Sequence, residues 1–290
     1  MKHLQAVRWL GGKGRMIRRL LPLLESIPHC RYVEPFGGGG VVLLNKKPVE
    51  VETYNDIDGG LFGFFKVIAD PELFEAFKRR VDALPLSREL YRGSSRDWRD
   101  ESDEVKRAVL WFVIARQSFG GRFGADWGMS ITESTGSMSH STSMWINGVK
   151  LLPKIHERLL RVQIENNDWR KVIDAHDTSD TLFYLDPPYF PDVRKSGHAR
   201  YEHELSIDDH HELIDRLLDI QGRAAISGYA NQVYDRLDVA GWKRIEWETY
   251  CSVAGRTRAT GMKGHGSAYR MQSRTECLWI KPYESELTLF

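Results

Sequence analysis

The sequence predicts an α/β protein with a doubly wound sheet that an inserted lobe interrupts. A glycine-rich turn at residues 37–40 stands between a short strand and a helix, which is typical of a βαβ unit. Strand and helix patterns alternate before residue 76 and again after residue 158, but not between them. We therefore expect a core formed by 1–75 and 159–290 and a mainly helical insert at 76–158, because an insertion in a surface loop costs little stability.

The first part of the core has the order of a βαβ unit. Apolar residues with helical spacing precede Pro28, and the strand that follows leads directly into the glycine turn. The expected elements are a helix over 15–27, a strand over 31–34, the opening of a helix at 41–45, a strand over 49–55 and a helix over 61–68.

The middle of the chain contains one clear expected element, a helix over 105–117. Residues 87–103 are charged and polar, and 118–143 are rich in Gly, Ser, Thr, Met and Trp. The α/β pattern then returns. Its expected elements are strands over 162–165, 181–185 and 224–227, a helix over 207–218 capped by Ser206, and an antiparallel pair over 242–250 and 276–281.

The composition of the 290 residues is that of a globular protein, with 41% hydrophobic residues, 28% charged residues and a mean hydropathy of -0.44. The 12 Phe, 11 Tyr and 9 Trp exclude a disordered chain. The longest apolar run, 108–115, is shorter than the roughly 20 residues that span a bilayer. With no basic segment followed by an apolar one at the start, we expect a cytoplasmic protein without membrane contact.

The cysteines exclude a metal or disulfide framework as the organising principle. Cys30, Cys251 and Cys277 are odd in number and lack the spacing of a zinc site. We therefore expect no bound metal.

Two stretches carry basic residues without acids, although the whole chain has 41 Lys and Arg against 40 Asp and Glu. Six basic residues lie between residues 2 and 19, and five lie between 251 and 275. Such runs can neutralise phosphates, or they can be ordinary solvated surface.

The glycine turn predicts a cofactor site. Glycines after a strand let the backbone approach a ligand closely. A dinucleotide fingerprint would need a third glycine where Val42 stands, and the carboxylate of Glu34 would repel a pyrophosphate. A cationic ligand with an adenosine moiety, S-adenosylmethionine, fits better, with Asp56 placed to bind ribose hydroxyls. The alternative is a plain tight turn with a solvent-facing Asp56.

The segment Asp186-Pro187-Pro188-Tyr189 follows the apolar strand over 181–185, where open α/β sheets place their sites. Two prolines fix both φ angles and remove two N–H donors, so the segment cannot extend the sheet. Its acceptors, the Asp186 carboxylate and the Pro187 carbonyl, suit the two N–H bonds of an amino group on a planar ring. Tyr189 offers a face for stacking that ring. The alternative is a Pro-Pro turn that merely closes the strand.

Together these motifs resemble the Dam-type, or alpha-class, DNA adenine-N6 methyltransferases. The resemblance is carried by E-P-F-G-G-G-G at 34–40, N-D at 55–56 and D-P-P-Y at 186–189, in that order. W-L-G-G-K at 9–13 is similar to the family's N-terminal element, and the resemblance continues through 167–169, 226–229 and 275–279. It implies a Rossmann-like S-adenosylmethionine-dependent methyltransferase sheet whose insert recognises the DNA target.

The resemblance also implies roles for individual residues. Trp9 and Lys13 would line the methionine end of the cofactor pocket, with Lys13 as partner of the carboxylate, and Asp168 would lie near the adenine ring. The expected cofactor-binding residues are Trp9, Lys13, Glu34, Phe36, Gly37, Gly39, Asp56, Asp168 and Asp186. The expected catalytic residues, which would hold a flipped-out adenine, are Asp186, Pro187, Pro188 and Tyr189. For Asp168 an Asx-type turn is the alternative.

The expected partner is double-stranded DNA, bound by a monomer. Arg116 and Arg122 lie in a segment, 116–123, that resembles the family's recognition segment, although a loop capping the preceding helix is the alternative. Arg256 and Arg258 would bind phosphates. The sequence leaves open the recognition site and whether a cognate restriction endonuclease exists.

The expected reaction is methyl transfer to the N6 amine of adenine in duplex DNA. The alternatives are a cytosine amine, an adenine in RNA, a protein amide, or a DNA-binding protein with a dead methyltransferase core. Asp rather than Ser before Pro-Pro-Tyr argues against cytosine in this family, and the large polar insert argues against a small protein tail. The intact set of Lys13, Asp56, Asp186 and Tyr189 argues against a dead core.

Overall fold

The protein, in a computed structural model, is described over residues 3–9, 11–130, 133–190, 203–250 and 273–283. In these ranges a seven-stranded sheet has the order β5-β2-β1-β6-β7-β9-β8. A short hairpin, β3–β4, lies apart from it. The strands are β1 (Arg31–Glu34), β2 (Val51–Asn55), β3 (Ser134–Thr135), β4 (Met138–Ser139), β5 (Gln163–Glu165), β6 (Thr181–Leu185), β7 (Arg223–Gly228), β8 (Lys243–Tyr250) and β9 (Ser273–Ile280).

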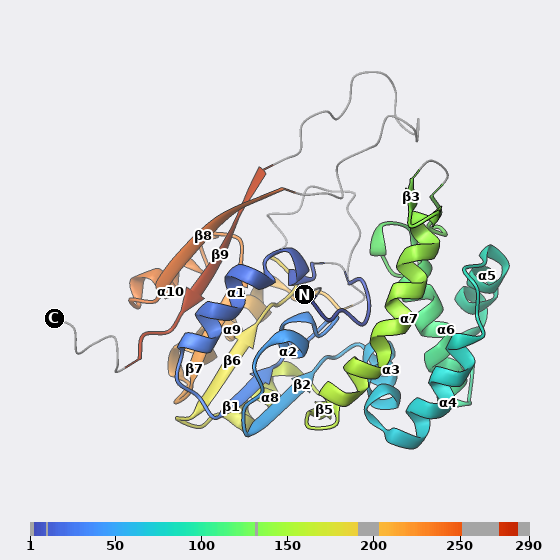
Figure 1. Cartoon of the computed structure of the whole chain (residues 1–290). Coiled ribbons are helices and arrows are strands. Elements are labelled where there is room, and N and C mark those ends of the chain that lie inside the picture. The colour runs from blue at the N-terminus through green and yellow to red at the C-terminus, as the bar shows by residue number, and fades with distance from the viewer. Residues whose placement is uncertain (1–2, 10, 131–132, 191–202, 251–272, 284–290) are drawn as a thin grey trace.

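Helices cover both faces of the sheet, and a helical lobe stands beside it (Figure 1). The helices and helical turns are η1 (Lys13–Arg15), α1 (Ile17–Ser26), α2 (Val41–Asn45), α3 (Gly59–Ala69), α4 (Pro71–Asp82), α5 (Arg88–Asp97), α6 (Glu104–Gln117), η2 (Phe119–Gly121), α7 (His140–Leu159), α8 (Trp169–His176), α9 (Ile207–Asp219) and α10 (Asp235–Val239). This confirms the predicted α/β class.

The strand order brings the two predicted site loops together. Strands β5, β2, β1, β6 and β7 are parallel, whereas β9 runs antiparallel to both β7 and β8. Arg31 of β1 pairs with Val51 of β2 on one side and Thr181 of β6 on the other. The chain order reverses between β1 and β6, and such a reversal opens a crevice at the carboxyl ends of the strands. The glycine turn follows β1 and the Asp186 loop follows β6.

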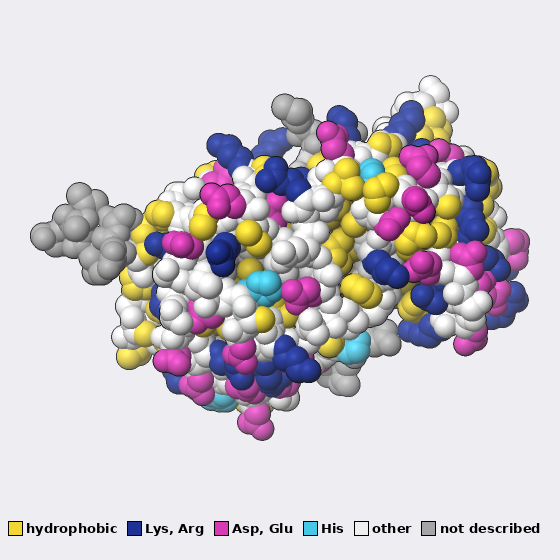
Figure 2. Space-filling model, turned by 90° about the horizontal axis from the view of Figure 1, so that it is seen from below, with side chains coloured by type: hydrophobic (Ala, Val, Ile, Leu, Met, Phe, Trp, Pro, Cys, Tyr) yellow, Lys and Arg dark blue, Asp and Glu magenta, His cyan; other side chains and the backbone are white. Residues whose placement is uncertain are grey.

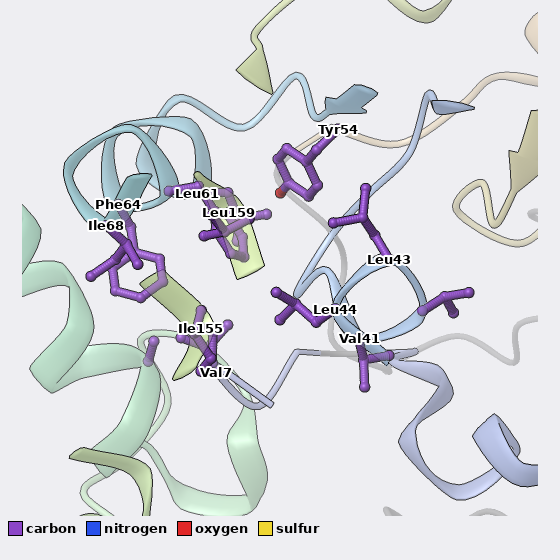
Figure 3. Packing of buried hydrophobic residues seen from close by; sticks show 14 of the residues in the cluster. Val7, Val41, Leu43, Leu44, Tyr54, Leu61, Phe64, Ile68, Ile155 and Leu159 are labelled. Atoms are coloured by element: carbon purple, nitrogen blue, oxygen red, sulfur yellow. The ribbon is translucent and has the colours of Figure 1, made fainter. Parts of the chain in front are cut away.

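The sheet separates two hydrophobic clusters, because successive strand residues point to opposite faces. On β6, Leu182 and Tyr184 pack with α1, α2, α3 and the lobe, whereas Phe183 and Leu185 pack with α8, α9 and α10. Figure 3 shows the first cluster, where residues from α2, β2, α3 and α7 meet beside Val7. The lobe and the core therefore share one hydrophobic interior.

The lobe is a bundle of α4, α5, α6 and α7, with the β3–β4 hairpin at one end (Figure 1). Its first helix begins at Pro71, and the insert bounds 76–158 stay a prediction. Arg158 of α7 pairs with the fully buried Glu52 of β2 at 2.7 Å and donates to the Leu43 carbonyl. This buried ion pair fastens the end of the lobe to the sheet.

The elements expected in the core are present, but the sequence did not predict helices α8 and α10. The bounds of β1, α2 and β6 coincide with the predicted ones. Ser206 caps α9 as predicted, and its hydroxyl accepts from the Asp209 backbone N–H while the Asp209 carboxylate accepts from the Ser206 N–H.

The middle of the chain contains more helix than predicted. Helix α5 lies in the stretch 87–103, which showed only polar composition, and α7 begins inside 118–143. The local sequence pattern did not predict these helices because tertiary packing stabilises them. Tyr91 of α5 and Trp145 of α7, for example, are buried.

On the face seen in Figure 2, basic and acidic side chains are interspersed and no single sign dominates, which is the pattern of a solvated surface. Over the residues that the structure describes, no helix combines the length and apolarity that crossing a bilayer requires.

Candidate active site

A cavity of about 340 Å³ lies at the carboxyl ends of β1, β2 and β6. Its volume falls within the range of small-molecule sites, roughly 300–1,000 Å³. Every residue expected from the sequence to bind the cofactor lines it: Trp9, Lys13, Glu34, Phe36, Gly37, Gly39, Asp56, Asp168 and Asp186. Pro188 lines it as well. The glycine turn and the Asp186 loop thus share one cavity.

The glycine turn is held tightly against β2. The Gly37 N–H donates to the Asn55 carbonyl at 2.7 Å, and the Tyr54 hydroxyl donates to the Gly38 carbonyl at 2.6 Å. Gly38 and Gly40 have φ of 50° and 66°, in the left-handed region that favours glycine. A Cβ on Gly37 would lie 2.2 Å from the Tyr54 ring. Glycine is therefore required at 37 by space and at 38 and 40 by conformation.

Asp56 closes the turn from the end of β2. One carboxylate oxygen accepts from the Gly38 N–H at 2.7 Å, and the other accepts from the Asp58 N–H at 2.9 Å. Burial raises the pKa of Asp56 to about 6 in spite of these bonds. A carboxylate has about four acceptor sites, so the group can still accept from ligand hydroxyls.

Apolar side chains also line the cavity. The rings of Phe36 and Trp169 have centroids 6.1 Å apart, and Leu205 also lines the cavity. Asp168 is the N-cap of α8: it accepts from the Arg170 N–H at 2.9 Å and pairs with the Arg170 guanidinium at 3.2 Å. The capping turn that the sequence offered as an alternative is therefore present, at the edge of the cavity.

The buried side chains of Lys13 and Glu276 form a polar cluster with Asp186 and Tyr189 of the loop. The Lys13 side chain is only 3% exposed, and its ammonium lies 2.5 Å from Asp186 Oδ1, 2.8 Å from the Tyr189 hydroxyl and 2.9 Å from Glu276 Oε1. The Tyr189 hydroxyl donates to the same Glu276 oxygen at 2.6 Å. Lys13 was expected to pair with a ligand carboxylate, but protein groups already engage its ammonium.

The charged groups in this cluster shift one another's pKa values. Burial alone would lower the pKa of Lys13, but Asp186 and Glu276 outweigh it and hold that pKa well above its usual value. Burial raises the pKa of Asp186 to about 6; Lys13 opposes this rise and Glu276 adds to it. Lys13 therefore stays charged, and Asp186 is a carboxylate above about pH 6.

The sequence suggested that Glu34 carries a negative charge, but its surroundings in the structure favour the neutral carboxylic acid. Glu34 is 2% exposed and accepts from the Tyr32 hydroxyl at 2.7 Å. Burial raises its pKa to about 8, and the nearby Asp186 contributes to the rise. In the protein without ligand, Glu34 is therefore mainly neutral at pH 7, and a cation bound in the cavity would favour its ionised form.

Of the predicted catalytic residues, Asp186 and Pro188 line the cavity, whereas Pro187 and Tyr189 lie outside its lining. Pro187 is buried, and the Tyr189 ring packs against Tyr229 with centroids 4.5 Å apart. Lys13 lies 5.1 Å from the Tyr189 ring centroid. The position of the Tyr189 ring is thus fixed by its contact with Tyr229 and by the bonds of its hydroxyl to Lys13 and Glu276.

Sequence reasoning missed Glu276 as a site residue. Its strand β9 places Glu276, Leu278 and Ile280 at alternate positions, and all three are buried. A single acid within an otherwise apolar run, 276–280, is a signal that could have identified it.

The expected DNA-binding arginines have different positions. The Arg116 guanidinium donates to the Met144 carbonyl at 2.6 Å and packs against Gly148, which joins α6 to α7. Burial lowers its pKa to about 10, and Arg8 contributes. Arg122 directly follows η2 and has no ion pair within the described ranges. Arg256 and Arg258 lie outside the described residues.

Comparisons with known proteins give consistent matches. A model of the D12 class N6 adenine-specific DNA methyltransferase family matches residues 9–242. A type II methyltransferase, M.MjaIII, from Methanocaldococcus jannaschii is 25% identical over 70% of this chain and 75% of its own. A DNA adenine methylase from Haemophilus influenzae is 21% identical over 78% of both chains. A DNA N-6-adenine-methyltransferase from Escherichia phage P1 is 23% identical over 75% of this chain and 28% of its own.

Proposed function

The chain belongs to the D12 class N6 adenine-specific DNA methyltransferase family, and from this premise we propose that it uses S-adenosylmethionine to methylate the N6 amine of an adenine flipped out of duplex DNA. Adenine-specific DNA methylation is the activity of the family. The observation that supports this assignment of the site is the single cavity shared by the glycine turn and the Asp186 loop, since methyl donor and acceptor must meet.

The residues around the cavity fit S-adenosylmethionine. Phe36 and Trp169 offer apolar surface for an adenine ring, and Asp56 has acceptor capacity left for ribose hydroxyls. A cationic group bound beside Glu34 would favour the ionised form of its carboxyl and so gain a negative partner. When bound there, S-adenosylmethionine supplies an electrophilic methyl group. Trp9 and Gly39 line the same cavity and would limit the space around the ligand.

The Asp186 loop would hold the target base. The Asp186 carboxylate and the Pro187 carbonyl would accept the two N–H bonds of the amine, which aims the nitrogen lone pair at the methyl group. Pro188 keeps the loop rigid, and Tyr189 offers its face to the base. The base must leave the duplex to reach this site, at a cost of a few kcal/mol.

Contacts to the DNA would offset that cost. We propose that the helical lobe, expected at 76–158, recognises the target sequence, with Arg122, which has no ion pair among the described residues, reaching a guanine edge or a phosphate. Arg116 would act through the α6–α7 packing that its guanidinium supports, with a smaller direct role. Phosphate binding by Arg256 and Arg258 stays a prediction. So do a monomeric state, a cytoplasmic location and a link to restriction–modification with a cognate endonuclease.

Asp56→Ala is expected to weaken S-adenosylmethionine binding by about 10- to 100-fold, because hydrogen bonds to a charged group contribute about 1.5–3 kcal/mol. Isothermal titration calorimetry measures the change. Asp180→Ala is the control, because Asp180 is exposed at the amino end of β6, away from the cavity. Unchanged cofactor affinity in a folded Asp56→Ala protein would contradict the proposed cofactor site.

A further inference from the structure

We propose that Glu276 is a positioning residue of the methyl transfer, which shares the Lys13 ammonium with Asp186 and so keeps the Asp186 carboxylate available to the adenine amine. The inference rests on the proposed role of Asp186 and deepens it. Glu276 does not line the cavity, so it would act through Lys13 and Tyr189 rather than on the base.

Glu276 contacts both the Tyr189 hydroxyl and the Lys13 ammonium that pairs with Asp186. Its Oε1 accepts from the Tyr189 hydroxyl at 2.6 Å and lies 2.9 Å from the Lys13 nitrogen. The Glu276 side chain is 9% exposed, so little water screens these contacts. One oxygen thus holds both the ring proposed to stack on the base and the cation next to Asp186.

The charges explain why a second carboxylate is needed. Lys13 is 2.5 Å from Asp186 Oδ1. If Asp186 were its sole carboxylate partner, the ammonium would draw charge from the group that must accept the amine. Glu276 takes part of that interaction, and the cluster of two carboxylates and one ammonium keeps a net negative charge. A carboxylate with more charge is a stronger acceptor for the N–H bonds of the base.

The surroundings of Asp186 indicate how this sharing would be detected. Among the described residues, the titratable groups that interact electrostatically with Asp186 are Lys13 on η1, Glu34 on β1, Tyr184 on β6, Tyr189 on the loop itself, Tyr234 before α10 and Glu276 on β9. Burial raises the pKa of Asp186 to about 6, and Glu276 adds to the rise. Removing the charge of Glu276 should therefore lower the pKa of Asp186. The acid limb of the pH–activity profile should then move to lower pH.

The test compares Glu276→Gln with the wild type from about pH 5 to pH 8. The rate constant kcat/KM for DNA at saturating S-adenosylmethionine reports groups of the enzyme before DNA binds. The wild-type acid limb is expected near pH 6, and the limb of Glu276→Gln lower by about one pH unit, with a reduced kcat on the plateau. Glu276→Asp, which keeps the charge, should restore the position of the limb.

Glu248→Gln is the matched control, because Glu248 is exposed on the adjacent strand β8 and makes the same charge change. An acid limb that stays in place in Glu276→Gln, or that moves equally in Glu248→Gln, would overturn the inference. Should the Gln variant fail to fold, Glu276→Met removes the charge at similar length and carries the same test. An inactive Asp186→Ala together with an unmoved limb would refute the role of Glu276 alone; an active Asp186→Ala would refute the proposed function.

Discussion

Asp186→Ala is expected to reduce methyl transfer by about 10²–10⁴-fold while leaving S-adenosylmethionine binding largely intact. The change removes the carboxylate that would accept the amine hydrogens, but it leaves the glycine turn, Asp56 and the apolar side chains of the cavity in place. Lys13 keeps a partner in Glu276, so the variant does not leave a buried ammonium without a counter-charge. The fold should therefore survive.

Transfer of labelled methyl groups to DNA measures the first effect, and calorimetric titration with S-adenosylmethionine measures the second. Asp180→Ala, at the amino end of the same strand, should behave as the wild type in both. The assigned role is wrong if Asp186→Ala loses cofactor binding but still methylates DNA when the cofactor is saturating.

Gly37→Ala is expected to destabilise the protein by about 1–3 kcal/mol and to weaken cofactor binding at least about tenfold. The added Cβ would lie 2.2 Å from the Tyr54 ring and 3.0 Å from the Asn55 carbonyl oxygen. Tyr54 is fully buried and its hydroxyl holds the Gly38 carbonyl, so the ring cannot yield without moving the turn. The displaced turn would then narrow the cavity.

Gly59→Ala is the matched control, because a Cβ on Gly59, the first residue of α3, would meet nothing within 4 Å. This variant should be neutral or slightly more stable. Thermal unfolding and calorimetric titration distinguish the two. Equal effects of both substitutions would show that the tight contact at Gly37 does not shape the site.

The core of the fold could be predicted because its signals are local. The strand β1, the glycine turn and the opening of α2 follow one another within about fifteen residues, and each has a distinct pattern. The apolar run of β6 ends at the Pro-Pro segment, which fixes its boundary. Alternation of strands and helices then implied a mainly parallel sheet, and the carboxyl ends of neighbouring strands meet at one edge.

The helices of the lobe could not be predicted in the same way. Helix α7 contains Gly148 and Pro153 and opens with a Ser- and Thr-rich turn, all of which lower intrinsic helix propensity. Its buried residues, among them Trp145, Leu152 and Ile155, pack against α3, α4 and α6. Contacts between distant segments, rather than local preference, stabilise these helices.

The sequence predicted which residues line the site, but it did not predict which side chains pair with one another there. The motifs identified the side chains around the cavity, yet they gave Lys13 a ligand carboxylate as partner where the structure shows Asp186 and Glu276. Lys13 is 173 residues from Asp186, and Tyr189 is 87 residues from Glu276. Such contacts depend on β9 lying next to β7 in the sheet, which no local pattern specifies.

The most direct test of the central claim is to identify the methylated base. The protein would be incubated with S-adenosylmethionine and unmethylated duplex DNA, the DNA digested to nucleosides, and the products examined by mass spectrometry, with Asp186→Ala protein in parallel. We predict N6-methyldeoxyadenosine with the wild type and a strongly reduced amount with the variant. Methylated deoxycytidine, or no methylated nucleoside from a protein that binds the cofactor, would contradict the assignment.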